Sequence, residues 1–327
     1  MMDRKQTNND LLTVKGLTKY FETRAGFLEK PTLVRAVDGV DLKVGHKDVL
    51  GLVGESGCGK STMGRSILRL IEPTDGEIIF DSEDVMKADS RKLRSLKRRM
   101  QIIFQDPFSS LNPRKRVIDT VGEPLIIHEI AKRRDLRDRV VSILEKVGLS
   151  SDSLYRYPHE FSGGQRQRIG IARALAVEPV FIVADEPLSA LDVSIQAQII
   201  NLLQDLQRSL GISFLFISHD LKVVRYFSER VAVMYLGIIV ETGLTEDIFT
   251  NPKHPYTEAL LSAIPIPDPS TKRKRIILPG DVPNPSQIPS GCRFHPRCPY
   301  RFDPCDKFRP KTTDIKGGHL VECHLRG

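Results

Sequence analysis

A glycine-rich stretch at residues 54–61 carries residue types that bind phosphate. Its sequence, Gly-Glu-Ser-Gly-Cys-Gly-Lys-Ser, fits the pattern G-x-x-x-x-G-K-[ST] and lies between a short apolar run and a segment with helical periodicity. Glycines let backbone N–H groups converge on phosphate oxygens, and the start of the following helix adds its positive end. Lys60 would neutralise phosphate charge, and the Ser61 hydroxyl suits Mg²⁺. The stretch predicts a site for a nucleoside triphosphate with Mg²⁺.

Two acidic residues, Asp185 and Glu186, follow a second apolar run at residues 181–184. A carboxylate at the C-terminal end of a parallel strand faces the same crevice as a phosphate loop. We expect Asp185 to hold Mg²⁺ and Glu186 to orient and deprotonate the attacking water. An apolar run ending in acid is a weak pattern by itself. Together with the phosphate loop it predicts a P-loop NTPase.

A second helix start occurs at residues 161–168, Phe-Ser-Gly-Gly-Gln-Arg-Gln-Arg. Ser162 and the two glycines open a segment whose apolar residues keep helical spacing. This helix start could bind a second face of a γ-phosphate. A well-capped amphipathic helix would explain Ser162 but, on the sequence, not Gly-Gly-Gln. Two phosphate-binding helix ends in one chain are what a dimer that sandwiches nucleotide needs.

The apolar patterning predicts the elements that must position these residues. Short buried strands are expected at residues 49–53, 78–80, 101–104, 181–184 and 214–217, and helices at 61–71 and 193–210. The strand–helix–strand order over residues 181–217 predicts a right-handed parallel crossover. The fold class is therefore α/β.

Composition limits the class of protein further. The chain has 327 residues, 49 Lys and Arg against 41 Asp and Glu, and a net charge of +8, which favours an anionic partner. Trp is absent and aromatic residues make up only 6%, which argues against a stacking surface for single-stranded nucleic acid. No stretch approaches about 18 apolar residues, and the start lacks an apolar signal, so we expect a cytoplasmic protein.

With these motifs in order, the chain resembles the ATP-binding subunits of ABC transporters, from about residue 11 to beyond residue 250. The signature Phe-Ser-Gly-Gly-Gln has Phe where Leu is commoner. Phe21 matches the aromatic residue that stacks on adenine, and Gln105 matches the Q-loop glutamine. Residues 189–192 match the D-loop, and His219 matches the switch histidine. The resemblance implies an ABC ATPase cassette over residues 1–260, with a helical subdomain at about 106–175.

The resemblance also implies roles for individual residues and a head-to-tail dimer with a second ATPase subunit. Catalysis is assigned to Glu186 and His219. The implied Mg²⁺ ligands are Ser61, Gln105 and Asp185. The implied ATP-binding residues are Phe21, Gly54, Glu55, Ser56, Gly57, Cys58, Gly59, Lys60, Ser61, Thr62, Gln105, Ser162, Gly163, Gly164, Gln165 and Asp192.

Three stretches, at residues 105–114, 254–260 and 291–324, resemble the dipeptide/oligopeptide/nickel importer branch of that family. The insert between Phe21 and Val34 is more like the second of two such ATPase subunits. The branch implies peptide import from the cytoplasmic face of the membrane, with two membrane-spanning permease subunits and an extracytoplasmic substrate-binding protein. A permease coupling helix would dock near residues 105–114. Nickel is an alternative cargo. A soluble ABC ATPase acting on nucleic acid is disfavoured because tandem cassettes and a coiled-coil insertion are both missing.

The chain changes character at residues 261–327, where prolines and cysteines gather. Dense prolines predict a linker or a loosely built appendage, and the basic run at residues 272–275 a solvated loop. Prolines beside Cys298 and Cys305 place both in tight turns. The spacing of Cys292, Cys298, Cys305 and Cys323 contains no CxxC, and disulfides are disfavoured in a reducing compartment. Four thiolates suit a [4Fe–4S] cluster, which some members of the branch carry; zinc and free thiols remain alternatives.

Overall fold

The computed structural model describes residues 10–23, 32–264 and 275–326. The insert at residues 24–31 and most of the basic run at 272–275 lie outside the described residues. Contacts divide the chain into two compact units. Among the described residues, the helix-rich unit comprises 87–217 with the short pieces 10–11 and 44–48, and the sheet-rich unit comprises 12–23, 32–43, 49–86, 218–264 and 275–326.

Three parallel strands form the sheet of the helix-rich unit. They are β6 (Met100–Ile103), β7 (Phe181–Asp185) and β8 (Ser213–Ile217), and β7 pairs with both of the others. Helix α7 (Val193–Leu210) joins β7 to β8 over the predicted residues. β7 and β8 are buried along their whole length, as their continuous apolar sequences predict. The predicted parallel strand–helix–strand unit is confirmed.

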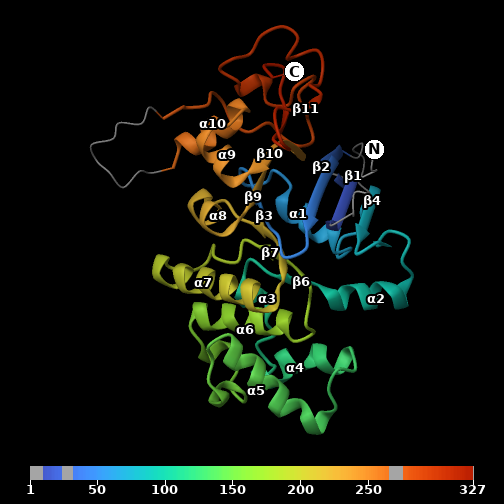
Figure 1. The fold of residues 1–327 in the computed structure, drawn as a ribbon, viewed down its shortest axis with the longest axis vertical. Helices are drawn as coiled ribbons and strands as arrows, with labels where there is room; N and C mark the ends of the chain where they lie inside the picture. The colour runs from blue at the N-terminus through green and yellow to red at the C-terminus, as the bar shows by residue number, and fades with distance from the viewer. Residues whose placement is uncertain (1–9, 24–31, 265–274, 327) are drawn as a thin grey trace, which may run out of the picture. The chain divides into compact units, whose positions relative to one another are not determined.

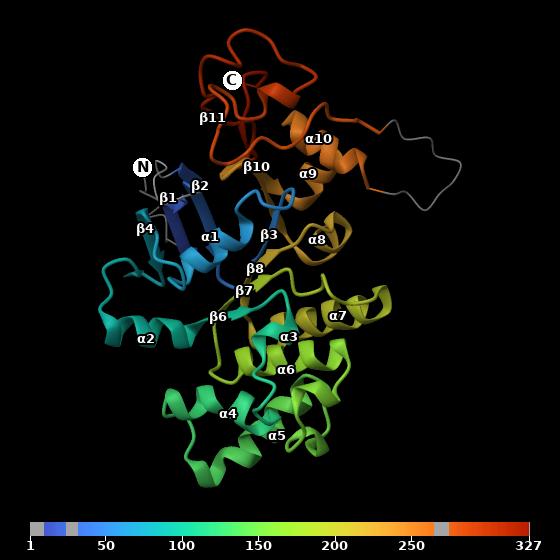
Figure 2. The same ribbon diagram turned by 180° about the vertical axis from the view of Figure 1, so that it is seen from behind.

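Three of the remaining helices of this unit gather around α6, whereas α2 packs on β6. Figures 1 and 2 show α4 and α5 side by side in green, and both pack on α6, as does α3. Residues 106–175, where the sequence predicts a helical subdomain, therefore contain helices and no strand. The helices of the unit besides α7 are α2 (Ser90–Arg99), α3 (Pro107–Ser110), α4 (Val117–Ile127), α5 (Leu136–Lys146) and α6 (Gly163–Leu175).

Two groups of strands build the sheet-rich unit. The first has the order β2–β1–β4–β5 and comprises β2 (Thr32–Gly45), β1 (Asp10–Thr23), β4 (Asp75–Phe80) and β5 (Glu83–Asp84). In the second, β3 (Val49–Val53) runs parallel to β9 (Arg230–Tyr235), and β9 pairs antiparallel with β10 (Ile238–Leu244). The helices of the unit are α1 (Lys60–Ile67), α8 (Leu221–Phe227), α9 (Thr245–Thr250) and α10 (Pro255–Ser262).

Helix α1 is shorter than the sequence predicts. The expected helix covers residues 61–71, whereas α1 ends at Ile67. Arg69 adopts a left-handed backbone conformation with φ of 49°. Its guanidinium donates to the Glu72 carboxylate at 2.9 Å and to the Val85 carbonyl at 3.1 Å. These side-chain contacts stabilise the end of the helix and override the apolar periodicity beyond it.

The C-terminal extension is built into the sheet-rich unit. Its strand β12 (Leu320–Glu322) pairs with β10 and with β11 (Thr312–Asp314), which continues the second group of strands. Phe294 and Val321 are fully buried. The expectation of a loosely built appendage is therefore wrong for this part. The pairing joins segments about 80 residues apart, so proline density, a local property, could not reveal it.

A buried carboxylate ties this extension to the strands. Glu241, in β10, accepts hydrogen bonds from the N–H groups of Lys253 at 2.6 Å and His254 at 3.0 Å. Its third partner is His319 Nε2, at 2.7 Å. A buried charge of this kind is tolerated because its lone pairs are satisfied. Glu241 thus links β10, the start of α10 and the C-terminal extension.

Among the described residues, no helix combines the length and the apolar character needed to cross a bilayer.

His254 predicts how the stability of the fold depends on pH. Its Nδ1 caps α10 by accepting from the Tyr256 N–H at 3.0 Å. Burial lowers the pKa of His254 from 6.5 to about 3. Between pH 6.5 and about pH 3, the unfolded chain therefore binds a proton at this residue and the folded chain does not. The contribution of neutral His254 to the free energy of unfolding is therefore complete above pH 6.5 and is lost as the pH falls below it.

We expect the variant His254→Asn to remove this part of the acid sensitivity. Asn keeps an oxygen that can cap α10 and has no titrating ring. The free energy of unfolding of the unchanged protein should fall by about 2 kcal/mol between pH 7.5 and pH 5 through this group. Denaturant titrations at several pH values measure the difference between the two proteins, which cancels other titrating groups. Parallel pH profiles would contradict the assignment.

Candidate active site

The glycine-rich loop at residues 54–61 lies between β3 and α1, as predicted. Two of its glycines are required by close backbone approach. A Cβ on Gly59, whose φ is 110°, would lie 2.0 Å from the Ala36 carbonyl oxygen. A Cβ on Gly54 would lie 2.2 Å from the carbonyl oxygen of Met234. The loop therefore lies against β2 and β9 at a distance that only glycine allows.

The lysine of the loop is buried and turned into the loop itself. Lys60 Nζ donates to the carbonyl oxygens of Gly54 at 2.9 Å and Glu55 at 3.0 Å, and lies 3.9 Å from Cys58 Sγ. The neighbouring thiol is also buried, and burial raises the pKa of Cys58 above its usual value. A raised pKa keeps Cys58 protonated, which fits a packing role and not a reactive thiolate.

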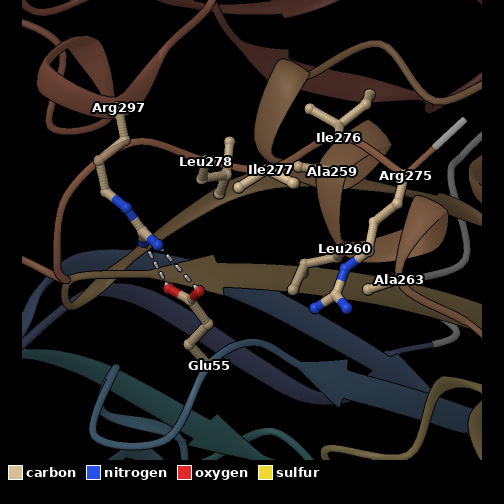
Figure 3. Close-up of a pocket in the computed structure, with 9 residues that line it drawn as sticks. All are labelled: Glu55, Ala259, Leu260, Ala263, Arg275, Ile276, Ile277, Leu278 and Arg297. Carbon is tan, nitrogen blue, oxygen red and sulfur yellow. Dashed lines mark hydrogen bonds and ion pairs between the residues drawn. The ribbon is translucent and has the colours of Figure 1, made fainter.

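Glu55 is fixed by two residues that sequence reasoning did not assign to the site. Its N–H donates to the Tyr256 hydroxyl at 2.8 Å. Its carboxylate receives two hydrogen bonds from Arg297, at 2.8 Å and 3.4 Å, drawn in Figure 3. Tyr256 belongs to the His-Pro-Tyr-Thr stretch that already stood out in the sequence, whereas no local signal marks Arg297.

The other candidates of the sheet-rich unit lie on β1, on α1 and before α8. Phe21 is half-buried, with Lys19 Nζ 4.9 Å from its ring centroid. Ser61 and Thr62 lie half-buried in the first turn of α1, and Ser56 is exposed in the loop. His219 is exposed and precedes Asp220, which caps α8 by accepting from the Lys222 N–H at 2.8 Å.

In the helix-rich unit, the structure brings Gln105 and Glu186 together. Asp185 ends β7 and is fully buried. Glu186 follows with φ of 46°, and its N–H donates to the Ile217 carbonyl at 3.0 Å. Its carboxylate accepts from Gln105 Nε2 at 3.0 Å. A non-glycine residue in this conformation is strained, and it sits where the sequence predicts the general base.

Ser162 and Gln165 cap α6 reciprocally. The Ser162 hydroxyl accepts from the Gln165 N–H at 3.3 Å, and the Gln165 side-chain oxygen accepts from the Ser162 N–H at 3.0 Å. This is a capping box, so helix capping explains the glutamine as well as the serine. The expectation that helix capping would explain Ser162 but not Gln165 is therefore wrong. The glycines have a separate reason, since a Cβ on Gly164 would lie 2.4 Å from Ile195 of α7.

Asp192 is the N-cap residue of α7. Its carboxylate accepts from the Ile195 N–H at 3.0 Å and from the Ser194 hydroxyl at 2.8 Å. These two hydrogen bonds hold the pKa of Asp192 below its usual value. Gln196 steadies the preceding turn by donating to the Leu188 and Leu191 carbonyls, each at 3.1 Å. The backbone at residues 189–192 is therefore fixed by the Asp192 cap and by the hydrogen bonds of Gln196.

Known proteins are similar to this chain along nearly its whole length. Residues 37–189 match the family model described as ABC transporter. A Bacillus subtilis protein, the oligopeptide transport ATP-binding protein AppF, is 49% identical over 319 residues, which cover 96% of this chain and 97% of that protein. The dipeptide transport ATP-binding protein DppF of Haemophilus influenzae is 47% identical, and 99% of each chain is covered.

The chain belongs to the ATP-binding subunits of ABC transporters. It is thus an ABC-type ATPase, and its P-loop α/β fold agrees with the prediction. A protein of Brucella ovis named for peptide import is 53% identical over 97% of this chain and 98% of its own length. Residues 240–305 match the model for the oligopeptide/dipeptide transporter C-terminal region.

Solved structures support the cassette fold. The ATP-binding cassette MJ0796, in a dimeric post-hydrolysis state bound to ADP and phosphate, is 30% identical with a TM-score of 0.64. The match covers 72% of this ABC ATPase and 98% of MJ0796. The protein cbiO1 of Clostridium perfringens is 26% identical with a TM-score of 0.63, over 74% of this chain and 92% of its own.

The four C-terminal cysteines of this ABC ATPase lie in the extension, and all are free thiols. Burial first, and then the charges of Cys323, Cys305 and Cys298, raise the pKa of Cys292 to about 12. The Cys292 N–H donates to the Cys305 carbonyl at 2.8 Å. Cys298 and Cys305 take part in tight turns, as predicted. Within the described part of the chain, no three His, Cys, Asp or Glu side chains are grouped to hold one metal ion.

Two glycines of α6 allow a matched test of the signature segment. Gly164→Ala places a methyl group against Ile195, whereas a Cβ on Gly170 meets nothing within 4 Å. We expect Gly164→Ala to lower the melting temperature through overpacking. Gly170→Ala should raise stability by up to about 1 kcal/mol because alanine is the better helix former. Thermal unfolding by circular dichroism compares them, and an equal effect of both variants would refute the close packing of α6 on α7.

Proposed function

We propose that this ABC ATPase powers the import of peptides through a membrane transporter. The observation that carries the proposal is the match of residues 240–305 to the oligopeptide/dipeptide transporter C-terminal region. Relatives named for peptide, oligopeptide and dipeptide transport, similar along nearly the whole chain, support the same cargo class. In this proposal residues 1–260 form the ATPase cassette and residues 261–327 a transporter-specific extension.

The phosphate loop binds the triphosphate of ATP in this proposal. Its backbone N–H groups and the start of α1 supply hydrogen bonds and positive potential. Lys60, which now donates to two loop carbonyls, exchanges these for phosphate oxygens when ATP binds. Ser61, Gln105 and Asp185 are oxygen donors of the type that Mg²⁺ takes, and Phe21 offers an aromatic face for adenine. Bound Mg²⁺ would neutralise charge on the phosphates.

Hydrolysis depends on Glu186 and His219. Glu186 orients the attacking water and accepts its proton, and Gln105, hydrogen-bonded to it at 3.0 Å, holds the carboxylate in place. His219 contacts the γ-phosphate and helps position it. Asp192 and the capped turn before α7 belong to the surface that meets the second ATPase subunit.

We infer that a second ATPase subunit, identical or homologous, completes the nucleotide site. Residues 162–165 of one subunit close over ATP held by Lys60 of the other. The capping box supports this role because it fixes the start of α6, a helix of 13 residues. Stabilisation by this second helix end is available only in the closed dimer, so closure and hydrolysis are linked.

The membrane partners are two permease subunits, with an extracytoplasmic substrate-binding protein delivering the peptide. The ATPase lies at the cytoplasmic face as a peripheral subunit and meets no nucleic acid. A permease coupling helix docks at residues 105–114. Phe108 in this segment supports the docking surface, since it is 61% exposed and its ring is 3.8 Å from the Arg166 guanidinium carbon.

The variant Glu186→Gln tests both the chemistry and the cargo. We expect ATP binding to persist while ATP turnover falls about 10²-fold or more, because the general base is lost. Uptake of a labelled peptide by vesicles carrying the complete transporter should fall with it. Glu145→Gln, an exposed position on α5, is the matched control. Undiminished turnover would remove Glu186 from its role, and ATP-driven uptake of Ni²⁺ without peptide uptake would overturn the cargo.

We further propose that Cys292, Cys298, Cys305 and Cys323 hold a [4Fe–4S] cluster. The donor set supports it: the extension carries four thiols, and burial raises the pKa of Cys292, Cys298 and Cys323. Zinc is disfavoured because the spacing of the four cysteines contains no CxxC. In a cluster each iron takes one thiolate, so the four sulfurs need not converge on one point. The bound group would cross-link the four cysteines within the extension.

Anaerobic purification from iron-replete cells tests this assignment. We expect about four iron and four sulfide per chain and a brown protein, and Cys298→Ser should lose the colour. Cys58→Ser is the matched control, because Cys58 lies in the phosphate loop and should leave the iron content unchanged. Colourless protein, or protein containing only zinc, would contradict the cluster.

A further inference from the structure

Arg297 connects the C-terminal extension to the phosphate loop by an ion pair. Its guanidinium donates to both carboxylate oxygens of Glu55, the second residue of the loop, at 2.8 Å and 3.4 Å. The Arg297 side chain is 9% exposed and that of Glu55 27%. Figure 3 shows the pair at one wall of a cavity of about 420 Å³, which residues 275–278 and α10 also line. Because the pair is largely removed from water, it is stronger than a surface ion pair.

A buried aromatic cluster fixes the backbone from which Arg297 reaches out. Phe294 packs against Tyr235 and Tyr256, with ring centroids 5.4 Å and 5.5 Å apart. Arg297 lies three residues further on, in the 3-10 helix His295–Arg297. Tyr256 also accepts the hydrogen bond from the Glu55 N–H. The cluster therefore sets the position of both groups that bind Glu55.

Every polar group of Glu55 is thereby engaged. Lys60 binds its carbonyl oxygen, Tyr256 its N–H, and Arg297 its carboxylate. The carboxylate belongs to the phosphate loop itself, five residues before Lys60. Left without Arg297, it would oppose the phosphates by charge repulsion and release one attachment of the loop.

We propose that Arg297 is a positioning residue for ATP binding, which neutralises Glu55 and holds the phosphate loop in its binding conformation. The proposal rests on the assignment of the loop as the ATP site. It gives the extension a part in nucleotide affinity, through one side chain that contacts the loop and no reacting atom.

The test is a double-mutant cycle on the full-length chain, with the dissociation constant of a fluorescent ATP analogue as the readout. Arg297→Ala should weaken binding about 5- to 20-fold, with kcat at saturating ATP changed by less than about 2-fold. Glu55→Gln removes the repelling charge and keeps a side-chain oxygen, and its own dissociation constant is the reference against which the double variant is compared. Glu55→Gln combined with Arg297→Ala should recover most of the lost affinity. Arg297→Lys, which retains the charge, should lie between Arg297→Ala and the unchanged protein.

Arg301→Ala is the matched control. Arg301 pairs with Asp306 at 3.0 Å inside the extension, and its replacement changes the net charge equally. Unchanged affinity in Arg297→Ala would overturn the proposal. So would an equal loss with and without Glu55→Gln, because Arg297 would then attract ATP directly or act only on folding. If Arg297→Ala does not fold, Arg297→Lys decides by the same comparison. Failure of the unchanged protein and of Arg301→Ala to bind the analogue would instead reject the ATP site itself.

Discussion

The nucleotide site depends on one constraint, which is that the backbone of its glycine-rich loop must be held in a fixed conformation. Glycines allow the backbone at residues 54–59 to approach Ala36 and Met234, but they add no contacts that hold it there. The order must come from neighbouring groups. Glu55 provides an attachment, since Tyr256 and Arg297 bind its N–H and its carboxylate from two other segments of the chain, and Lys60 of the loop itself binds its carbonyl oxygen.

These attachments make the C-terminal extension part of the ATPase fold. Arg293 pairs with Asp38 of β2 and donates to the Leu236 carbonyl, and both groups are buried or nearly so. Glu241 joins β10 to His319 in the same way. A buried ion pair is costly to form and more costly to break, so these residues favour one placement of the extension. The segment that carries Arg293 and Arg297 also begins at Cys292 and ends at Cys298. The fold of the cysteine-bearing region and the shape of the phosphate loop are therefore physically linked.

The sequence predicts the parts of this structure that depend on local pattern. Continuous apolar runs place β3, β7 and β8, and periodicity places α7 with the observed bounds, because burial and helical spacing are written in neighbouring residues. It does not predict the end of α1, where the contacts of Arg69 decide, or the order in the proline-rich extension. Arg297 illustrates the limit. Its partner lies 242 residues away, and no pattern in the chain links the two. The nucleotide motifs were found by their spacing, whereas the contacts that fix them arise from tertiary structure.

The capping box of α6 shows that a structural and a functional reading of one motif can be the same. The first turn of a helix leaves backbone N–H groups without intrahelical partners. Ser162 satisfies the Gln165 N–H, and Gln165 satisfies the N–H of Ser162, so the turn is rigid while Gly163 and Gly164 keep their N–H groups at its start. Glycine at 164 also lets α6 lie close to Ile195 of α7, the helix that Asp192 caps. A rigid helix start binds an anion with less reorganisation than a frayed one. Helix capping and phosphate binding by this segment are therefore compatible, because the capping box is what would hold the free N–H groups of the helix start in place.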